Sequence, residues 1–582
     1  MGVKIILEED IIGIDFGTSN SKMAFMELDT PTIIRNKEDM INTPSVIYFK
    51  EEGDIIVGEQ AKKNLISYPQ RTIYSIKRKM GSTFRFKLNG MSYPPEYLGA
   101  LIIRKLIQDA KETTGHQFNR AVVSVPANYT DGQRQSIKDA AEIAGLTVIQ
   151  MINEPTAAAL AYGINEMEDK RLLVYDFGGG TFDVTVLTVS QGFFDVEACS
   201  GINQLGGNDI DKRISEVIMK KIRKIYKINP NKNLSTVSRI REIAENVKIQ
   251  LSTDTKVEIK VPFIGTDSKG LPINFEMEFS REKLEELIRD LIYKTKKPLQ
   301  EVLDAAHLSP EDLDEIILVG GTTKIPAVQD FVEQFFKKRP NKAIDPYEAV
   351  ALGAAIAGAS GKPIKSRNKI KSIEISDVLP HSLGIFAIPE GVSKILLKNI
   401  KIPIKRTKLY SNLVDYTPLL MIEVFQGESS IPMESNRLGK FFIEVEPKPA
   451  GENQLDVTFE ITKEFGILQV TARDRDSKNQ RTVRLEAKGR LSKKEKNIWR
   501  QKLLGTRFTT VYFFNEKNNS EISISANPNA TIANLLQELH KLQFLQRNKK
   551  FQLFHNNTPL QKNIQLKNLG TTDTLEIHVR ET

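Results

Sequence analysis

The sequence predicts an α/β part up to about residue 360, an all-β part up to about residue 490 and a small mixed module at the end. In the first part, apolar strand-like segments alternate with amphipathic helical ones, such as residues 133–144 and 281–306. In the second part, stretches such as LMIEVFQ, KFFIEVE and LDVTFEIT alternate polar and apolar residues between turn signals, which is typical of antiparallel strands. The third part, from TTVYFFNE onward, has the pattern of two strands, a helix and two further strands.

A glycine-rich hairpin stands at the centre of the α/β part. The segment Leu172–Leu187, LLVYDFGGGTFDVTVL, combines a buried strand that ends at Asp176, a turn of glycines and a returning strand. Bare glycine amides can cradle a phosphate, and Asp176 and Asp183 could hold hydrated Mg²⁺ beside it. Taken alone, the pattern fits a glycine hairpin with two solvated aspartates equally well.

A second copy of this pattern favours the phosphate site. In IIGIDFGTSNSKMAFMEL, residues Ile11–Leu28, Asp15 matches Asp176 and the following Phe-Gly is repeated. Two such units predict a duplicated domain in which each half brings a phosphate loop to one cleft. A third element, Ile316–Val332, is a strand, a Gly320-Gly321 turn and a helix, which pyrophosphate or sugar could approach closely. The chain has no GxxxxGK[ST] or GxGxxG motif, which excludes P-loop and Rossmann sites.

Several longer strings carry a resemblance to a known family. They are IGIDFGTSNS, INTPSVIYF, IKRKMG, VVSVPANYTDGQRQSIKDAAEIAG, INEPTAAALAYG, VYDFGGGTFDV, LGGNDID, LVGGTTKIPAVQ and DPYEAVALGAA. Through them, from about residue 10 to about residue 490, the chain resembles the DnaK-type 70-kDa heat-shock chaperones. The resemblance implies an actin-like ATPase domain, a duplicated ribonuclease-H-like α/β fold, followed by a β-sandwich that binds peptides.

The same resemblance implies an ATPase that binds ATP/ADP and Mg²⁺, with K⁺ as a further candidate cation. The residues implied for catalysis are Lys77, Glu154, Asp176, Thr181 and Asp183, and Mg²⁺ would be held through water by Asp15, Asp176 and Asp183. The residues implied for nucleotide binding are Asp15, Gly17, Thr18, Ser19, Asn20, Gly178, Gly179, Gly180, Gly206, Gly207, Glu245, Lys248, Ser252, Gly320, Gly321, Lys324 and Asp345. Two positions depart from the family. Lys324 replaces the usual Arg and lacks a planar face to stack on a base, and Tyr347 stands where an acid is usual.

In the β-rich part, the resemblance implies an apolar peptide-binding groove and a pair of interdomain signalling residues. The groove residues are Ile385, Ile388, Tyr410, Leu413, Leu420 and Ile422, although any one of them could as well be an ordinary core residue. The signalling pair is Pro126 and Arg134. Two departures put the coupling in doubt: the linker has Glu374 and Ser376 where the family is almost all leucine, and Gln150 replaces a basic residue that contacts J-domain partners.

The expected domains are 1–360 for nucleotide binding, 361–375 as linker, 376–490 for substrate binding, 491–507 as a short helical remnant and 508–582 as a final domain. The final domain resembles ubiquitin and the β-grasp fold, and it stands where the family has a helical lid. Its helix should pack Ile532, Leu535, Leu536 and Leu539 on strands that carry Val511, Phe513, Leu553, Leu575 and Ile577. It could fold alone and recruit a partner, or fold only against the groove as a substitute lid. Its last residues lack a Gly-Gly tail, so conjugation through this end is not expected.

Composition narrows the cellular setting. The single cysteine, Cys199, excludes an intramolecular disulfide framework and fits a reducing cytoplasm, and its alternating neighbourhood predicts a buried strand residue. A net charge of +9 can indicate nucleic acid, but the lysines are dispersed, so a solvated surface is favoured. The histidines are not at metal-ligand spacing, and we expect no zinc or iron site. Without a signal-peptide pattern or an apolar run that could span a bilayer, we expect a cytoplasmic protein with no membrane partner.

Two functions fit these observations. The first is an ATP-hydrolysing chaperone that binds exposed apolar segments of unfolded proteins, with a J-domain co-chaperone and a nucleotide-exchange factor as candidate partners. The second is a nucleotide-gated adaptor that links clients to a proteolytic or ubiquitin-like system through the final domain, whose partner the sequence does not specify. The intact carboxylates and Lys77 favour the first, whereas the missing lid and changed linker favour the second. A small-molecule kinase on the same fold would leave the β-rich part unexplained.

Overall fold

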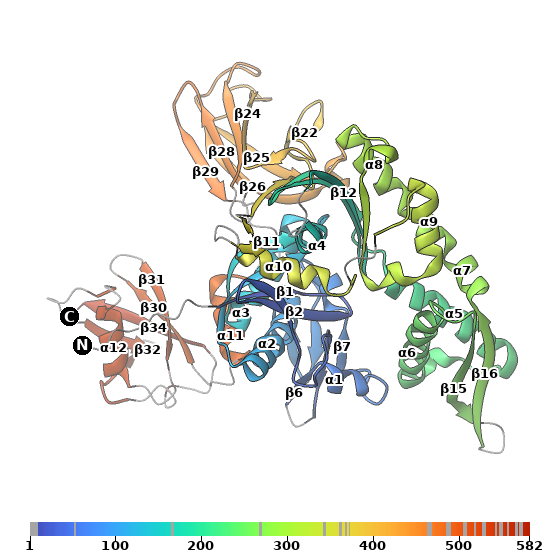
Figure 1. Cartoon of the computed structure of the whole chain (residues 1–582). Coiled ribbons are helices and arrows are strands. Elements are labelled where there is room, and N and C mark those ends of the chain that lie inside the picture. Colours follow the sequence, from blue (N-terminus) through green and yellow to red (C-terminus); the bar gives the residue numbers. More distant parts are fainter. Residues whose placement is uncertain are drawn as a thin grey trace. The chain divides into compact units, whose positions relative to one another are not determined.

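The computed structural model describes residues 10–51, 54–163, 168–266, 271–341, 345–359, 364–366, 369–371, 373–462, 468–484, 491–503, 509–516, 520–526, 531–541, 544–545, 551–555, 558–564, 569 and 574–581. The chain divides into two compact units, one within residues 1–490 and one made chiefly of residues 491–582, and each is described by itself. The elements of both are labelled in Figure 1. Among the residues that these ranges cover, no helix has the length and apolar character needed to cross a membrane.

The first large sheet of unit one carries the N-terminal hairpin. Its strands are β1 (Asp10–Asp15), β2 (Asn20–Glu27), β3 (Thr30–Ile34), β4 (Thr43–Pro44), β10 (Phe118–Val125) and β11 (Thr147–Asn153). Their order is β11-β10-β1-β2-β3, with β4 also paired to β2. Strand β1 runs parallel to β10 and antiparallel to β2, which in turn runs antiparallel to β3.

The second large sheet repeats this arrangement around the glycine-rich hairpin. Its strands are β12 (Lys170–Phe177), β13 (Phe182–Ser190), β14 (Phe193–Ile202), β17 (Glu315–Val319), β20 (Glu374–Val378) and β23 (Lys401–Ile402), in the order β17-β12-β13-β14-β20-β23. Strand β12 runs parallel to β17 and antiparallel to β13, and β13 runs antiparallel to β14. The series β10-β1-β2-β3 and β17-β12-β13-β14 therefore share order and direction, as the duplicated sequence pattern predicts.

Two helices with small residues pack closely beside these sheets. Helix α4 (Glu154–Gly163) lies against α10 (Ala349–Gly358), and a Cβ added at Gly353 would come within 1.7 Å of the Ala157 carbonyl oxygen. Strand β1 approaches the same helix, because a Cβ at Gly13 would lie 2.3 Å from the Ala355 nitrogen. Glycine and alanine thus bring β1 and both helices together at backbone contact distance.

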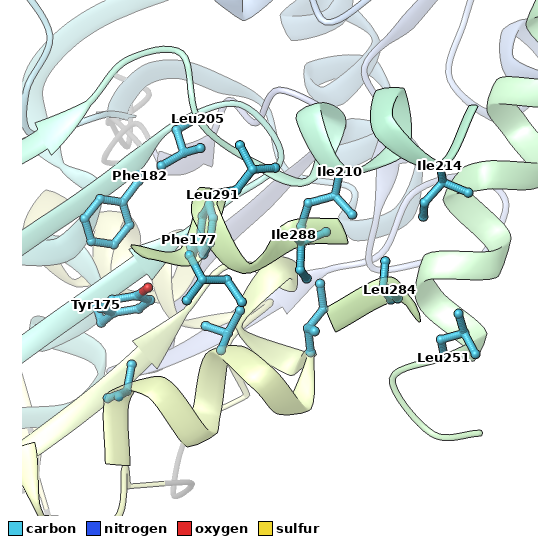
Figure 2. Close-up of a cluster of buried hydrophobic side chains, with 14 of the residues drawn as sticks. Tyr175, Phe177, Phe182, Leu205, Ile210, Ile214, Leu251, Leu284, Ile288 and Leu291 are labelled. Atoms are coloured by element: carbon cyan, nitrogen blue, oxygen red, sulfur yellow. The ribbon is translucent and has the colours of Figure 1, made fainter. Parts of the chain in front are cut away.

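A hydrophobic core anchors the glycine-rich hairpin (Figure 2). Tyr175, Phe177 and Phe182 of the hairpin strands are fully buried, and the rings of Phe177 and Phe182 meet edge to face with centroids 5.6 Å apart. They belong to one cluster with Ile210, Ile214, Leu251, Leu284, Ile288 and Leu291 from the surrounding helices. Because these buried side chains fix both strands in the core, the turn between the strands is held in one position.

The helices that supply this core are α5 (Gly207–Tyr226), α6 (Leu234–Gln250), α7 (Arg281–Lys294), α8 (Lys296–Ala306) and α9 (Pro326–Phe336), together with the hairpin β15 (Lys256–Thr266) and β16 (Pro272–Ser280). The prediction of one continuous helix over residues 281–306 is wrong, since α7 and α8 are separated at Thr295. Pro298 explains the break: a proline has no N–H to donate and its ring clashes with the carbonyl four residues earlier.

The remaining α/β elements are β5 (Val46–Phe49), β6 (Ile55–Val57), α1 (Glu59–Lys63), β7 (Thr72–Tyr74), the 3-10 turn Ile76–Lys79, β8 (Phe86–Leu88), β9 (Met91–Tyr93), α2 (Pro95–Thr114) and α3 (Asp131–Ala144). The single cysteine, Cys199 on β14, is buried, and burial raises the pKa of its thiol to about 12, as expected of a core residue.

The segment between the α/β and β-rich parts contains strands. Within it, β18 (Ile364–Ser366) and β19 (Lys369–Lys371) pair antiparallel, while residues 361–363, 367–368 and 372 of the expected linker lie outside the described ranges. Strand β20 adds to the second sheet by parallel pairing with β14, Glu374 opposite Phe193 and Ser376 opposite Asp195. Ile373 is buried in the core of that sheet and Ile375 packs against it, so the neighbouring polar residues Glu374 and Ser376 do not prevent this strand from pairing with β14.

The β-rich part consists of two four-stranded sheets. One has the order β22-β21-β25-β26 and the other β24-β27-β28-β29. The strands are β21 (Leu383–Ala387), β22 (Gly391–Leu396), β24 (Ile404–Tyr410), β25 (Leu419–Gln426), β26 (Asn436–Glu444), β27 (Leu455–Ile461), β28 (Leu468–Asp474) and β29 (Gln480–Arg484). One buried cluster draws on both sheets, with Val424 and Phe441 from the first and Val457 and Val470 from the second. The arrangement is a β-sandwich, as predicted.

In the described residues of the second unit, one of two helices packs against a mixed sheet. After α11 (Lys493–Leu503) come β30 (Thr509–Asn515), β31 (Ser520–Ala526), α12 (Ile532–Lys541), β32 (Phe551–His555), β33 (Thr558–Pro559) and β34 (Thr574–Glu581). The sheet order is β31-β30-β34-β32-β33, with β30 and β34 parallel and the other pairs antiparallel. Nearly all residues predicted for its core lie in one cluster, while the side chain of Leu575 is outside the description.

Candidate functional site

Two turns meet at a cleft in unit one. A Cβ added at Gly179 would lie 2.4 Å from Ser19 Oγ, and one at Gly180 would lie 2.4 Å from Thr18 Oγ1. The backbone at Gly206, just before α5, is equally close, because a Cβ there would lie 2.5 Å from the carbonyl of Gly179. Only glycine allows three backbone segments to converge in this way. The result is a surface of bare backbone and hydroxyl groups suited to phosphate oxygens.

Four buried carboxylates surround this surface. Asp15 ends β1, Glu154 begins α4, and Asp176 and Asp183 stand opposite each other on β12 and β13. Burial and the neighbouring carboxylates raise the pKa of Asp176 well above its usual range. Burial likewise raises the pKa of Asp183 to about 6 and that of Glu154 to about 7. Such a cluster is strained electrostatically until positive charge enters it.

Lys77 supplies one such positive charge. It lies in the 3-10 turn Ile76–Lys79, is 2% exposed and forms an ion pair with Glu154. Burial acts to lower the pKa of Lys77, but Glu154, Asp15 and Asp176 more than offset it, so the pKa stands above its usual value. The hydroxyl of Tyr129 donates to the Lys77 carbonyl at 3.1 Å and fixes the turn. The ion pair with Glu154 and the fixed turn therefore hold the ammonium in its charged form among the carboxylates, with little exposure to solvent.

The next residue, Arg78, ties this turn to the opposite side of the cleft. Its Nε and Nη2 donate to the Gly180 carbonyl at 3.1 and 2.8 Å, and Nη2 pairs with Asp209 of α5 at 2.5 Å. A planar guanidinium can hold a carbonyl and a carboxylate together in this manner.

The carboxylates fit a hydrated magnesium ion. Asp183 is fully buried, its Oδ1 accepts from the Asn128 amide at 2.9 Å, and its Oδ2 has no hydrogen-bond partner. An unsatisfied buried carboxylate oxygen calls for a cation or an ordered water, and hard oxygen donors suit Mg²⁺. In the described ranges, no three His, Cys, Asp or Glu side chains converge closely enough to bind a metal directly.

The other end of the cleft is suited to a nucleoside. Lys248 of α6 pairs with Asp211 at 2.8 Å, and the neighbouring Glu245 pairs with Lys62 of α1 at 3.2 Å. The Tyr347 ring lies under Lys324, whose Nζ is 4.1 Å from the ring centroid. A Cβ at Gly321 would lie 2.9 Å from the Tyr347 hydroxyl, so this ring covers the glycine turn.

Most residues predicted for nucleotide binding or catalysis line one cleft. They are Asp15, Gly17, Thr18, Ser19, Asn20, Lys77, Glu154, Asp176, Gly178, Gly179, Gly180, Thr181, Gly207, Glu245, Lys248, Gly320 and Gly321. Five others are not among the residues that line it: Asp183, Gly206, Ser252, Lys324 and Asp345. The sequence reasoning did not single out Lys22, Arg78, Ile249, Val319, Thr322, Pro346 or Val350, of which all but Arg78 line the cleft. For Lys22 a signal existed, because it follows Asp15 at the same spacing by which Asp183 follows Asp176.

The signalling pair lies near the β-rich part. Pro126 is buried, and Arg134 donates from Nη2 to Asn153 Oδ1 at 2.6 Å. Asn153 in turn donates to Asp377 Oδ2 of β20 at 2.9 Å. Burial raises the pKa of Asp377. These bonds form a continuous polar chain from α3 to the strand that leads into the β-sandwich.

The six residues predicted for a peptide groove do not share one environment. Ile385 and Ile422 are buried in the core between the sheets, Tyr410 and Leu420 are half-buried against that core, and Ile388 and Leu413 are exposed. Further exposed apolar side chains on this part are Phe386, Val414, Tyr416, Leu419, Met421, Ile431, Met433 and Phe442. The six predicted residues are thus divided between the core and the surface of this part.

Comparisons with known proteins agree with this architecture. The family described as "Hsp70 protein" matches residues 11–88 and 84–576. The "Chaperone protein DnaK" of Thermotoga petrophila is 41% identical over 496 residues, which cover 84% of this chain and 82% of the relative. The proteins of the same name from Thermosipho melanesiensis, 41% identical over 498 residues, and Cyanidium caldarium, 39% identical over 512 residues, cover equal shares. The repeated sheets, the cleft and these matches together establish that the chain belongs to the Hsp70 family.

Proposed function

We propose that the chain is an ATP-driven chaperone of the DnaK type, which hydrolyses ATP with Mg²⁺ and binds exposed apolar segments of unfolded polypeptides. One observation carries the proposal: a buried, charged Lys77 paired with Glu154, beside Asp176, where two glycine turns meet. A buried ion pair in a cleft surrounded by carboxylates of raised pKa is typical of a catalytic site.

The chain's own residues account for most of the chemistry. The backbone and hydroxyls of Thr18, Ser19 and Thr181 would hold the phosphates. Asp15, Asp176 and Asp183 would hold Mg²⁺ through water. When bound, Mg²⁺ supplies charge neutralisation on the phosphates. Glu154, with a pKa of about 7, accepts the proton of the attacking water, and Lys77 stabilises the charge that develops on the transferred group.

The β-sandwich is the proposed client-binding domain. Exposed Ile388 and Leu413, with half-buried Tyr410 and Leu420, support an extended apolar segment held against the strand edges. Ile385 and Ile422 contribute from the core beneath. Clients, a J-domain co-chaperone and a nucleotide-exchange factor are the partners that this cycle would require, in a cytoplasmic setting.

We further propose the domain layout 1–360, 361–375, 376–490, 491–507 and 508–582, with the last as a ubiquitin-like β-grasp domain in place of a helical lid. The strand order of this domain supports the proposal. Numbered within the domain, its strands lie in the order second, first, fifth, third, fourth, the first and fifth are parallel, and one helix covers the sheet. That is the arrangement expected when a helical crossover joins two hairpins.

Single-turnover hydrolysis of ATP, with and without an unfolded peptide, tests the function. We expect hydrolysis that Mg²⁺ and the peptide both accelerate. Asp183→Asn should abolish the acceleration by Mg²⁺, whereas Lys256→Met, at an exposed lysine, should leave it unchanged. Hydrolysis without any response to peptide would exclude a chaperone cycle, and absence of nucleotide binding would exclude the ATPase.

A further inference from the structure

The two hairpins differ at one equivalent position. In the strand pairing, Asp176 lies directly opposite Asp183, whereas Asp15 lies directly opposite Lys22. Directly opposite residues of an antiparallel pair project to the same side of the sheet, so each pair presents its charges together. The glycine-rich hairpin thus offers two carboxylates, and the N-terminal hairpin offers a carboxylate and an ammonium.

Lys22 occupies the cleft itself. It is 7% exposed, lines the cleft, and its Nζ lies 3.2 Å from Asp15 Oδ2. The same ammonium is 5.8 Å from the centroid of the Tyr347 ring. Lysine is rarely buried, and a buried ion pair gives little net stability compared with apolar side chains of similar size. A stabilising role therefore does not account for a buried lysine at this place, whereas contact with a polyanion does.

The charges in the cleft indicate what this lysine does. Lys77 is paired with Glu154 and Lys22 with Asp15, so Asp176 and Asp183 supply most of the negative charge that a water-bridged divalent ion would meet, and Asp15 supplies little. A monovalent metal ion beside Asp15 would meet the ammonium of Lys22 at hydrogen-bond distance and be repelled. The residues at this hairpin therefore do not fit K⁺, which the family resemblance offered as a candidate.

We propose that Lys22 is a nucleotide-binding residue that acts as a built-in monovalent cation: its ammonium neutralises Asp15 and contacts the phosphates. The inference rests on the proposed ATPase function and deepens it. Nucleotide binding and hydrolysis then require Mg²⁺ but no added monovalent metal ion. K⁺ and the ammonium ion resemble the side-chain ammonium group of Lys22 in charge and size. Either ion can therefore take the place of this group when the lysine has been removed, but not while the lysine is present.

The experiment compares wild type with Lys22→Met and Lys22→Arg at equal ionic strength in potassium, ammonium or tetramethylammonium chloride. ADP affinity is measured by calorimetry and hydrolysis in single turnovers, both with Mg²⁺ present. Wild type should behave alike in all three salts. In tetramethylammonium, Lys22→Met should bind ADP and hydrolyse ATP about tenfold less well. Potassium or ammonium should restore most of the loss. Lys22→Arg, which keeps the charge, should remain independent of the salt.

Controls separate this inference from other outcomes. Lys256→Met removes an exposed lysine that pairs with Glu278 at 3.0 Å on β15–β16, outside the cleft, and should match wild type. Wild type that needs potassium, or Lys22→Met that equals wild type in tetramethylammonium, overturns the inference while leaving the ATPase intact. Failure of wild type to bind ADP in any salt overturns the proposed function and this inference with it. If Lys22→Met does not fold, the salt response of wild type and of Lys22→Arg decides the question alone.

Discussion

Replacement of Lys77 by alanine should separate hydrolysis from nucleotide binding. Lys77 is 2% exposed, and its ammonium is already paired with Glu154. Because the carboxylate compensates this charge before hydrolysis begins, the ammonium contributes little to nucleotide binding in the ground state. During hydrolysis, negative charge develops on oxygens of the transferred group, and a donor fixed in place, such as the Lys77 ammonium, stabilises that charge without having to reorient. Loss of one buried donor of this kind costs about 3 kcal/mol, or about a hundredfold in rate.

Single-turnover hydrolysis and ADP calorimetry measure the two effects on the same protein. We expect Lys77→Ala to slow hydrolysis at least about a hundredfold and to change the ADP dissociation constant less than about threefold. Lys79→Ala is the matched control, because Lys79 lies in the same 3-10 turn but is exposed. Hydrolysis at the wild-type rate in Lys77→Ala, or equal losses in rate and affinity, would refute the assignment of this lysine to the transition state.

Four further predictions concern other parts of the chain. Burial, with Lys398 and Arg134 nearby and Glu428 opposing them, lowers the pKa of His381 below 6.5. Because the unfolded chain then binds the proton first, the free energy of unfolding should fall as the pH drops below about 6.5, and His381→Gln should lose this dependence in urea titrations. Lys62→Ala removes a half-exposed ion pair with Glu245 that is worth at most about 1 kcal/mol. Stopped-flow should therefore show ADP release about twofold to fivefold faster in Lys62→Ala, whereas Lys63→Ala should release ADP at the wild-type rate. If, as proposed, no helical lid covers the β-sandwich, a labelled peptide should leave it quickly in every nucleotide state, with micromolar-class affinity; ADP-stabilised retention for many minutes in stopped-flow would contradict this. Residues 506–582 expressed alone should unfold cooperatively and give dispersed amide NMR signals, because Val511, Phe513, Leu535, Leu539 and Ile577 already form a core; a fragment that orders only with 376–490 added would show a clamp instead.

Local patterns predicted the elements whose cause is local. The two Asp-Phe-Gly hairpins and the apolar face of α12 follow directly from residue spacing, since burial on one face imposes that spacing. The break at Thr295 was missed because helical periodicity continues through Pro298, and only the proline ring interrupts the hydrogen bonds.

Features that depend on distant partners were harder to predict. The spacing of Lys22 from Asp15 hinted at its role, but only the strand register shows that the two side chains stand directly opposite each other. The burial of Ile385 and Ile422 depends on which face of each strand meets the second sheet, and Ile388 and Leu413 are exposed because they lie beyond the ends of β21 and β24. Charge clusters assembled from several strands and helices leave no periodic trace in the chain.

The pairing of β20 with β14 has a consequence for how this chain can diverge in sequence. The strand is attached through main-chain amides and carbonyls, and these are the same whichever side chains stand at Glu374 and Ser376. The packing that holds the linker therefore depends on Ile373 and Ile375, whereas the main-chain pairing places no demand on the side chains at the alternate positions. Because β20 shares main-chain hydrogen bonds with β14, it must follow the twist of that strand or separate from it.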